Sequence, residues 1–169
     1  MRKLNILIAG STGYIGVQLI KLLIKHKYVN IRYLCGNNSV GKNISFYDKS
    51  LNIKKLPKII KYDKKYLKNI DVIFTALPNG EAQKISKNLL KKNTLIDLAA
   101  DFRLGKSSEY SKWYKQKHKA SKNIKKAFMH YLKFQEIKLK ILILLVALAV
   151  IPHLYFCHLS LCFKLTLLI

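Results

Sequence analysis

The chain has 169 residues, 50% of them hydrophobic, which is enough for one domain with a buried core. Its formal net charge of +24 would ordinarily indicate a nucleic-acid or anionic-membrane partner, but nearly all basic residues are lysines scattered along the chain, a bias that AT-rich codons produce. Arginine, which makes bidentate contacts to phosphates and bases, occurs only at Arg2, Arg32 and Arg103, so we expect no nucleic-acid partner.

The cysteines and the N-terminus narrow the class of protein further. Cys35, Cys157 and Cys162 form neither a metal-ligand pattern nor an even disulfide set, so we expect no metal site. The first apolar run has only about five residues, too few for a signal peptide. We therefore expect the N-terminal part of the chain to be cytoplasmic.

The first recognisable unit is a strand, a glycine-rich turn and a helix. An apolar run over Ile6–Ala9 leads into Gly10, Gly13 and Gly16, and a helical apolar pattern follows. Glycine tolerates a positive φ and has no Cβ to keep the backbone away from a pyrophosphate, and the helix N-terminus offers free N–H groups to that anion. Surface loops also collect glycines, but this order of elements predicts a dinucleotide fold.

A second strand is expected over Asn30–Cys35, followed by the loop Gly36–Lys42. A fold that prefers NAD carries Asp or Glu at the tip of this strand, where the acid binds the ribose 2′-hydroxyl. Here the loop holds small polar residues and Lys42, which leave room for a 2′-phosphate and favour NADP. A generic loop would lack the acid as well.

The later pattern alternates strands and helices. We expect a short strand over Ile53–Leu56 and buried strands over Asp71–Leu77 and Thr94–Ala100, with a turn at Pro78–Gly80 and a helix from Glu81. Such alternation predicts an α/β fold with a Rossmann-type, doubly wound parallel sheet.

Three segments follow the carboxyl ends of the expected strands. They are Gly10–Gly16, Pro78–Gly80 and Asp101–Arg103. Because ligands of such sheets bind beyond the carboxyl ends of the strands, these segments are expected to share one site.

An aromatic segment comes next. At helical spacing, Tyr110, Trp113, Tyr114 and His118 fall on one face. For Tyr110 and Trp113 we favour a packing role over a chemical one. His118 is a candidate general base, but a histidine without a partner in the sequence is more often a surface or packing residue.

These motifs, in this order and spacing, resemble N-acetyl-gamma-glutamyl-phosphate reductase, an enzyme of arginine biosynthesis. The matching pieces are GSTGYIG at 10–16, GK at 41–42, LPNG at 77–80, IDLAADFRL at 96–104 and YSKWYKQKH at 110–118. The resemblance implies a cytoplasmic two-domain oxidoreductase that uses NADPH to reduce an acyl phosphate, its small-molecule substrate, to a semialdehyde through a cysteine thioester.

The resemblance also implies which residues bind NADP. It places Ser39 near the 2′-phosphate and Pro78 and Asn79 near the nicotinamide. The residues implied to hold the pyrophosphate are Gly10, Ser11, Thr12, Gly13, Tyr14, Ile15 and Gly16.

The resemblance stops at about Ala127. The cysteine nucleophile of the family lies in a proline–glycine–cysteine–tyrosine–proline–threonine segment and is assisted by a histidine of the second domain, and neither segment is present in this sequence. We therefore expect residues 1–127 to be an incomplete NADP-binding domain and residues 128–169 an apolar tail that is no domain. No catalytic residue is assigned, and we do not expect the oligomer of the family to form.

The tail has two interpretations. Ile141–Phe163 carries no charge apart from two histidines and is long enough to cross a hydrocarbon core of ~30 Å as a helix, which indicates a C-terminal membrane anchor. The alternative is out-of-frame sequence, in which case the hydrophobicity is accidental. The tail would then have no specific membrane partner and would cause aggregation or non-specific association.

The genetic code favours the out-of-frame interpretation. Read from the third base of each codon, Phe128–Phe134 permits Tyr, Ala, Leu, Pro, Glu and Ile, in which Ala and Leu are forced. In the same frame, Val146–Leu154 permits Cys, Pro, Gly, Cys, Tyr, Pro, Thr and Ser. Because these are the two segments that the family carries there, we hypothesise that a frameshift near residue 127 made this chain an inactive, truncated pseudogene product.

Overall fold

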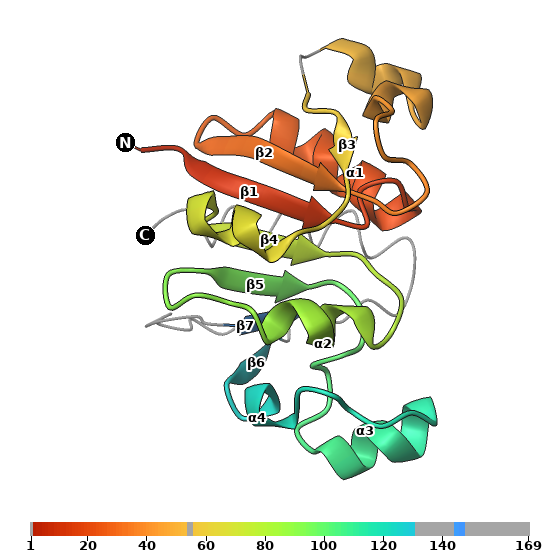
Figure 1. The fold of residues 1–169 in the computed structure, drawn as a ribbon, viewed down its shortest axis with the longest axis vertical. Coiled ribbons are helices and arrows are strands. Elements are labelled where there is room, and N and C mark those ends of the chain that lie inside the picture. The colour runs from red at the N-terminus through yellow and green to blue at the C-terminus, as the bar shows by residue number, and fades with distance from the viewer. Residues whose placement is uncertain (1, 54–55, 131–143, 148–169) are drawn as a thin grey trace.

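The computed structural model describes residues 2–53, 56–130 and 144–147. Within them, seven strands form one parallel sheet in the order β3-β2-β1-β4-β5-β7-β6 (Figure 1). The strands are β1 Leu4–Ala9, β2 Val29–Cys35, β3 Ile59–Ile60, β4 Val72–Thr75, β5 Thr94–Asp97, β6 Ala127–His130 and β7 Leu144–Ala147.

Four α-helices and three short 3-10 helices connect the described strands. The α-helices are α1 Tyr14–Ile24, α2 Glu81–Ser86, α3 Ser107–Tyr114 and α4 Ser121–Ile124. The 3-10 helices are η1 Ile44–Phe46, η2 Lys49–Ile53 and η3 Lys64–Asn69. This alternation confirms the predicted Rossmann-type α/β fold.

Both faces of the central strand β1 are buried, as in a doubly wound sheet. Along β1, Ile6 and Ile8 pack in one core cluster with α1, whereas Leu7 and Ala9 pack in the other with α2 and η3. Side chains of a strand alternate between its two faces, so an unbroken apolar run is what this position requires. The apolar runs therefore specify the central strands.

The register brings the carboxyl ends of the central strands together. Ala9 pairs with Cys35 of β2 on one side and with Thr75 of β4 on the other, and Thr75 pairs with Asp97 of β5. The turns that follow β1, β2, β4 and β5 consequently lie along one edge of the sheet. This edge is where the predicted site segments meet.

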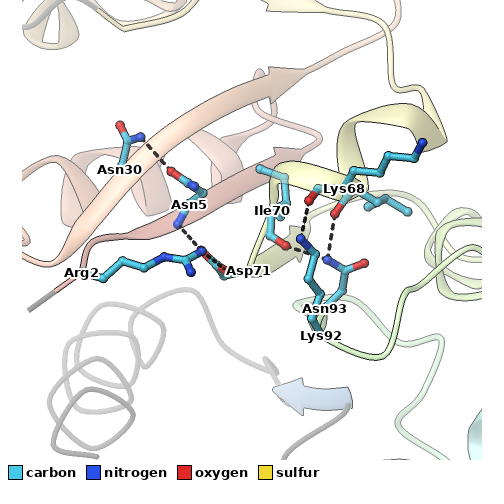
Figure 2. A network of polar contacts seen from close by, with 9 residues as sticks. Arg2, Asn5, Asn30, Lys68, Ile70, Asp71, Lys92 and Asn93 are labelled. Atoms are coloured by element: carbon cyan, nitrogen blue, oxygen red, sulfur yellow. Dashed lines mark hydrogen bonds and ion pairs between the residues drawn. The ribbon is translucent and has the colours of Figure 1, made fainter.

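Polar side chains tie down the opposite, amino-terminal edge (Figure 2). Asp71, just before β4, accepts hydrogen bonds from Asn5 N at 2.8 Å and from Arg2 Nη2 at 3.0 Å. The side-chain amide of Asn93, just before β5, donates to the carbonyls of Leu67 and Ile70 at 3.0 and 2.7 Å. β4 and β5 therefore each begin one residue after a polar side chain that anchors this edge.

The short strand predicted over Ile53–Leu56 is not found at its two end residues, and residues 54–55 between them lie outside the described residues. Ile53 ends η2 instead of starting a strand, and the strand in this part of the chain is β3, two residues after Pro57. Proline has no N–H to donate to a ladder, so pairing begins beyond it. The two residues of β3 pair in parallel with Leu34 and Cys35 of β2.

The range predicted as an apolar tail contributes β7 and most of β6. β7 pairs in parallel with β5, and β6 pairs in parallel with β7 at the edge of the sheet. The rest of the tail lies outside the described residues, including the predicted span Ile141–Phe163 apart from β7. In the part of the chain that the structure describes, no helix is long and apolar enough to cross a membrane.

Candidate nucleotide-binding site

The turn after β1 fits closely against the end of β4. Gly10 has φ +83°, and a Cβ added there would lie 2.1 Å from the carbonyl oxygen of Ala76. Both the backbone conformation and the lack of space therefore require glycine at this position. The close approach places the turn between β2 and β4.

The start of α1 rests directly on the same turn. A Cβ on Gly16 would lie 2.2 Å from the carbonyl oxygen of Gly10 and 2.9 Å from the Cα of Ser11. A Cβ on Gly13, in contrast, would meet nothing closer than 3.5 Å, and Gly13 is exposed. Gly10 and Gly16 thus allow backbone segments to pack closely, whereas Gly13 leaves the solvent side of the turn without a side chain.

Three donors of the turn are used to hold it against β2. The backbone N–H groups of Gly10 and Ser11 and the hydroxyl of Ser11 all donate to the carbonyl oxygen of Cys35, at 3.0, 3.1 and 3.1 Å. Ser11 is fully buried. Ser11 thus lies in the turn, but its N–H and hydroxyl point to Cys35.

The first turn of α1 offers the donors for an anion. The amides of Tyr14, Ile15 and Gly16 have no acceptor within the helix, because no turn precedes them. The N-cap residue Gly13 contributes no side-chain cap, and the first turn holds no acidic residue. The positive end of the helix dipole is therefore open to a phosphate.

The remaining predicted residues of the turn flank this opening. Tyr14 is 70% exposed, and Thr12 is partly buried with its methyl group close to Gly36. Ile15 is partly buried against the core cluster that contains α1. The segment 10–16 thus surrounds the start of α1 at the carboxyl edge of the sheet.

The loop after β2 is fixed by backbone hydrogen bonds to the segment that contains β3. Gly36 N–H donates to Ile60 at 3.0 Å, Gly41 N–H to Ile59 at 2.8 Å, and Ile59 N–H to Lys42 at 3.0 Å. No acidic residue interrupts the loop Gly36–Lys42. Its position beside the turn 10–16 follows from the pairing of β1 with β2.

Ser39, the predicted 2′-phosphate residue, is buried within this loop. The phenol of Tyr47 donates to Ser39 Oγ at 2.5 Å, and the ammonium of Lys42 lies 4.8 Å from the ring centroid of Phe46. Sequence reasoning missed Tyr47, although an aromatic residue shortly after a small polar loop was the available signal. The acid that follows, Asp48, is paired with Lys21 of α1 at 2.5 Å.

The loop between β4 and α2 presents the two predicted nicotinamide residues to solvent. Pro78 and Asn79 are exposed, and Gly80 adopts φ +92°. The amide of Gly80 donates to the carboxylate of Asp101 at 2.6 Å. Pro78 and Asn79 thus protrude from a loop whose far end is anchored.

A buried acid organises the turn after β5. Asp97 accepts hydrogen bonds from Thr75 Oγ1 at 2.8 Å and from the amides of Ala99 and Asp101 at 3.2 Å. Burial, together with the charge of Asp101, raises the pKa of the Asp97 carboxyl to about 6. Asp97 therefore joins the end of β4 to the turn that leads to Asp101.

Arg103 ends the third predicted segment. Its Nη2 lies 3.5 Å from the carbonyl oxygen of Ala99, and its Nε is buried without a hydrogen-bond partner among the described residues. The guanidinium thus retains donor capacity at the carboxyl edge of the sheet.

His118 is a packing residue. Its Nδ1 accepts a hydrogen bond from Ala120 N–H at 3.2 Å, so Nε2 carries the proton and donates to the carbonyl oxygen of Asp101 at 2.8 Å. Its ring meets those of Tyr110 and Phe102 edge to face. Because the backbone occupies both ring nitrogens, the general-base interpretation is not supported.

The aromatic stripe is only partly confirmed. Tyr110 is fully buried and its ring lies 4.8 Å from that of Tyr114, whereas Trp113 is 72% exposed. The packing role predicted for Trp113 is wrong, because α3 is a single short helix at the surface and ends at Tyr114. Lys115 then turns the chain with φ +54°, so His118 reaches the interior from outside the helix.

Comparisons with known proteins show which proteins this chain is similar to. The family model of the semialdehyde dehydrogenase NAD binding domain matches residues 5–155. N-acetyl-gamma-glutamyl-phosphate reductase from Brachyspira hyodysenteriae is 38% identical over 117 residues, which is 69% of this chain and 33% of that protein. The reductase from Thermoanaerobacter pseudethanolicus is 41% identical over 124 residues, 72% of this chain and 36% of that protein.

A solved structure with a similar fold is aspartate semialdehyde dehydrogenase with NADP from Candida albicans. It is 23% identical with a TM-score of 0.49, and the match covers 62% of this chain and 32% of that one. The present chain spans about a third of the length of the curated relatives that it matches.

Proposed function

The chain belongs to the family of semialdehyde dehydrogenase NAD-binding domains, and from this membership we propose that it is the NADP-binding part of an N-acetyl-gamma-glutamyl-phosphate reductase. The observation that carries the proposal is the turn at Gly10–Gly16, packed between β2 and β4 with the first-turn amides of α1 left open. A pyrophosphate over these amides would meet both their N–H groups and the helix dipole. The reductase acts in arginine biosynthesis, and we place the chain in the cytoplasm.

NADP is preferred to NAD in this proposal because of the loop after β2. The loop offers the hydroxyl of Ser39 and the ammonium of Lys42 and holds no acid that would repel a 2′-phosphate. Tyr47 donates to Ser39 Oγ, which leaves the proton of the serine hydroxyl free to point to a phosphate oxygen. Pro78 and Asn79 would then lie beside the nicotinamide.

When bound, NADPH supplies a hydride, and the proposed substrate is a small acyl phosphate. The reduction also requires a thiolate to form the thioester. Cys35 does not meet this need, because burial raises the pKa of its thiol to about 12 and keeps it protonated. We therefore assign the described residues a binding role and no catalytic one.

Titration of the full chain with NADPH, followed by the fluorescence of the cofactor, tests the cofactor assignment. We expect saturable binding of NADPH that is tighter than binding of NADH. The absence of saturable binding would overturn the proposed dinucleotide site. Equal affinities for the two cofactors would overturn the preference for NADP alone.

We propose further that residues 128–169 are translated out of frame, so that this chain is an inactive remnant of the reductase. The support is the alternate-frame match of two separate segments to the motifs of the family. The nucleotide sequence of the gene decides the matter. Immediate stop codons in the third-base frame, or no second-domain motifs there, would refute the frameshift.

A nucleotide-binding module with a C-terminal membrane anchor is the second candidate. The uncharged stretch Ile141–Phe163 favours it. Carbonate extraction of membranes from cells that express the chain separates the anchor from the out-of-frame tail. An integral anchor stays with the membrane pellet, whereas an out-of-frame tail without a specific membrane partner does not.

The frameshift proposal also implies that the oligomer of the family does not form. Sedimentation of the purified chain would check this.

A further inference from the structure

Asp101 is a carboxylate in the protein interior. Its side chain is 0% exposed, and none of the ion pairs among the described residues includes it. Its Oδ1 accepts from Gly80 N at 2.6 Å, Gln83 Nε2 at 2.9 Å and Tyr110 Oη at 2.7 Å, and its Oδ2 accepts from Gln83 N at 3.3 Å. These donors replace the water that the buried carboxylate has lost.

The same carboxylate caps helix α2 from a distance. In an ordinary capping box, the side chain of the N-cap residue bonds the N3 amide, and the N3 side chain bonds the N-cap amide. Here the N-cap residue is Gly80, which has no side chain, and Asp101 bonds both amides, those of Gly80 and of the N3 residue Gln83. Asp101, from another segment of the chain, thus replaces both side chains of the capping box.

The loop with Pro78 and Asn79 is therefore held at both ends by acids of the β5 segment. Asp97 bonds Thr75 at the end of β4, and Asp101 bonds Gly80 at the start of α2. Gln83 extends the second anchor, because its Oε1 accepts from the amide of Lys119 at 2.6 Å. Between the two anchors, Pro78 and Asn79 are exposed at the carboxyl edge of the sheet.

We propose that Asp101 is a positioning residue that fixes Pro78 and Asn79 where the nicotinamide end of NADPH lies. The inference rests on the proposed function. It assigns a distinct task to each half of the cofactor site. The turn 10–16 and Ser39 hold the adenine half, and the carboxylate of Asp101 sets the surface that meets the nicotinamide half.

Aspartate suits this task better than its neutral analogue. Asparagine has one acceptor oxygen, and its amide nitrogen would face a backbone N–H that needs an acceptor. Tyr110 stays a donor, because burial and its bond to Asp101 raise the pKa of the phenol. Replacement of Asp101 by Asn should therefore leave one of the two amides, that of Gly80 or that of Gln83, without its acceptor.

The test compares two ligands on the full chain. NADPH carries both halves of the cofactor, whereas adenosine 2′,5′-bisphosphate carries the adenosine and the 2′-phosphate without the nicotinamide. For Asp101→Asn we expect about a tenfold loss of affinity for NADPH, the scale of one hydrogen bond to a charged group. Affinity for adenosine 2′,5′-bisphosphate should change by less than about twofold, as expected of an independent site.

A matched control is Asp63→Asn. Asp63 also caps a short helix, since its Oδ1 accepts from Lys65 N at 2.9 Å at the start of η3. Among the described residues it has no hydrogen bond to the loop 78–80 or to Asp101. We expect this variant to leave both affinities unchanged. An equal loss for both ligands in Asp101→Asn would indicate a purely structural role and overturn the proposal, as would unchanged binding of NADPH.

Tyr110→Phe keeps the proposal testable if Asp101→Asn does not fold. It removes a single neutral donor to Oδ1, and we expect a selective but smaller loss for NADPH. Equal effects on both ligands would again overturn the proposal. If the wild-type chain binds neither ligand, the proposed function itself fails; if it binds both and neither variant is selective, only the role of Asp101 fails.

Discussion

The two halves of the binding edge are built by different means. In the glycine half, which comprises β1, the turn 10–16, α1 and β2, backbone groups pack against backbone groups and glycines make the room. In the carboxylate half, which comprises β4, α2, β5 and the turn 97–103, buried acids hold the loops through side chains. The first half is therefore sensitive to volume, and the second is sensitive to charge.

This contrast has a physical origin in the turns. The turn after β1 is closed by three donors that converge on one carbonyl, that of Cys35, so it needs no side chain other than Ser11. The loop after β4 ends at Gly80, whose amide finds its acceptor in Asp101, 21 residues further along the chain. The glycine half closes on neighbouring backbone, whereas the carboxylate half closes only when β5 is in place.

The largest expected effect is that of Gly10→Ala. The added Cβ would lie 2.1 Å from the Ala76 carbonyl oxygen at a φ of +83°, so either the turn or β4 must move. We expect the free energy of unfolding to fall by at least about 3 kcal/mol. Urea denaturation followed by circular dichroism measures it.

Gly105→Ala is the control, since a Cβ there meets nothing within 4 Å. We expect it to change the free energy of unfolding by less than about 0.5 kcal/mol. Similar losses in both glycine variants would contradict the assignment of the glycine half as sensitive to volume, since Gly105 has room for a Cβ.

The second effect concerns charge and is expected in Asp97→Asn. The pKa of Asp97 is raised from 3.8 to about 6, so the folded state binds this proton more tightly than the unfolded state does. The stability that this group contributes is present below pH 3.8 and is lost as the pH rises through about 6. The stability of the wild type relative to Asp97→Asn should fall by up to roughly 3 kcal/mol between pH 4 and pH 7.

Asp48→Asn tests the sign of that prediction. Hydrogen bonds from Lys21 and Ser50 lower the pKa of the Asp48 carboxyl to about 2, so its contribution is present above pH 3.8 and is lost as the pH falls. The wild type should therefore lose stability relative to Asp48→Asn on acidification, the opposite of the trend for Asp97→Asn. Parallel trends in the two variants would contradict the assignment of Asp97 as a buried acid.

A smaller effect is expected at the tip of the glycine half. Ser39→Ala removes the hydroxyl that we assign to the 2′-phosphate, so affinity for NADPH should fall about fivefold while that for NADH stays the same. Ser50→Ala, at an exposed position of η2, is the control with the same chemical change. If Ser39→Ala lowers the affinity for NADPH and for NADH equally, the hydroxyl does not bind the 2′-phosphate.

The smallest effect is expected at the surface of α3, the helix whose Tyr110 bonds Asp101 of the carboxylate half. Trp113 is 72% exposed, so Trp113→Ala should change the free energy of unfolding by less than about 0.5 kcal/mol. Tyr110→Phe, on the buried face of the same helix, should lower it by about 1.5 kcal/mol because the donor to Asp101 is lost. Thermal denaturation of the two variants side by side checks this order, and the reverse order would show that Trp113 packs after all.

The sequence predicted the glycine half in more detail than the carboxylate half. Apolar runs specified β1, β2, β4 and β5, and the spacing of the glycines placed the turn 10–16. Predictions failed where tertiary contacts decide: Ile53 belongs to η2, and β3 has only two residues. Trp113 shares a helical spacing with Tyr110, but the short helix buries only one of them.

By itself the sequence determined the Rossmann-type sheet, the position of the dinucleotide turn and the absence of an acid from the loop after β2, because strand periodicity and glycine spacing are local properties of the chain. Only the tertiary structure decided that Ser11 bonds Cys35, that His118 packs with both ring nitrogens on backbone, and that Asp101 caps α2. These contacts join residues that are apart in the chain, and they form once parallel strands in register bring their carboxyl ends together. A buried acid has no local pattern of its own, so its partners become visible only when the sheet is assembled.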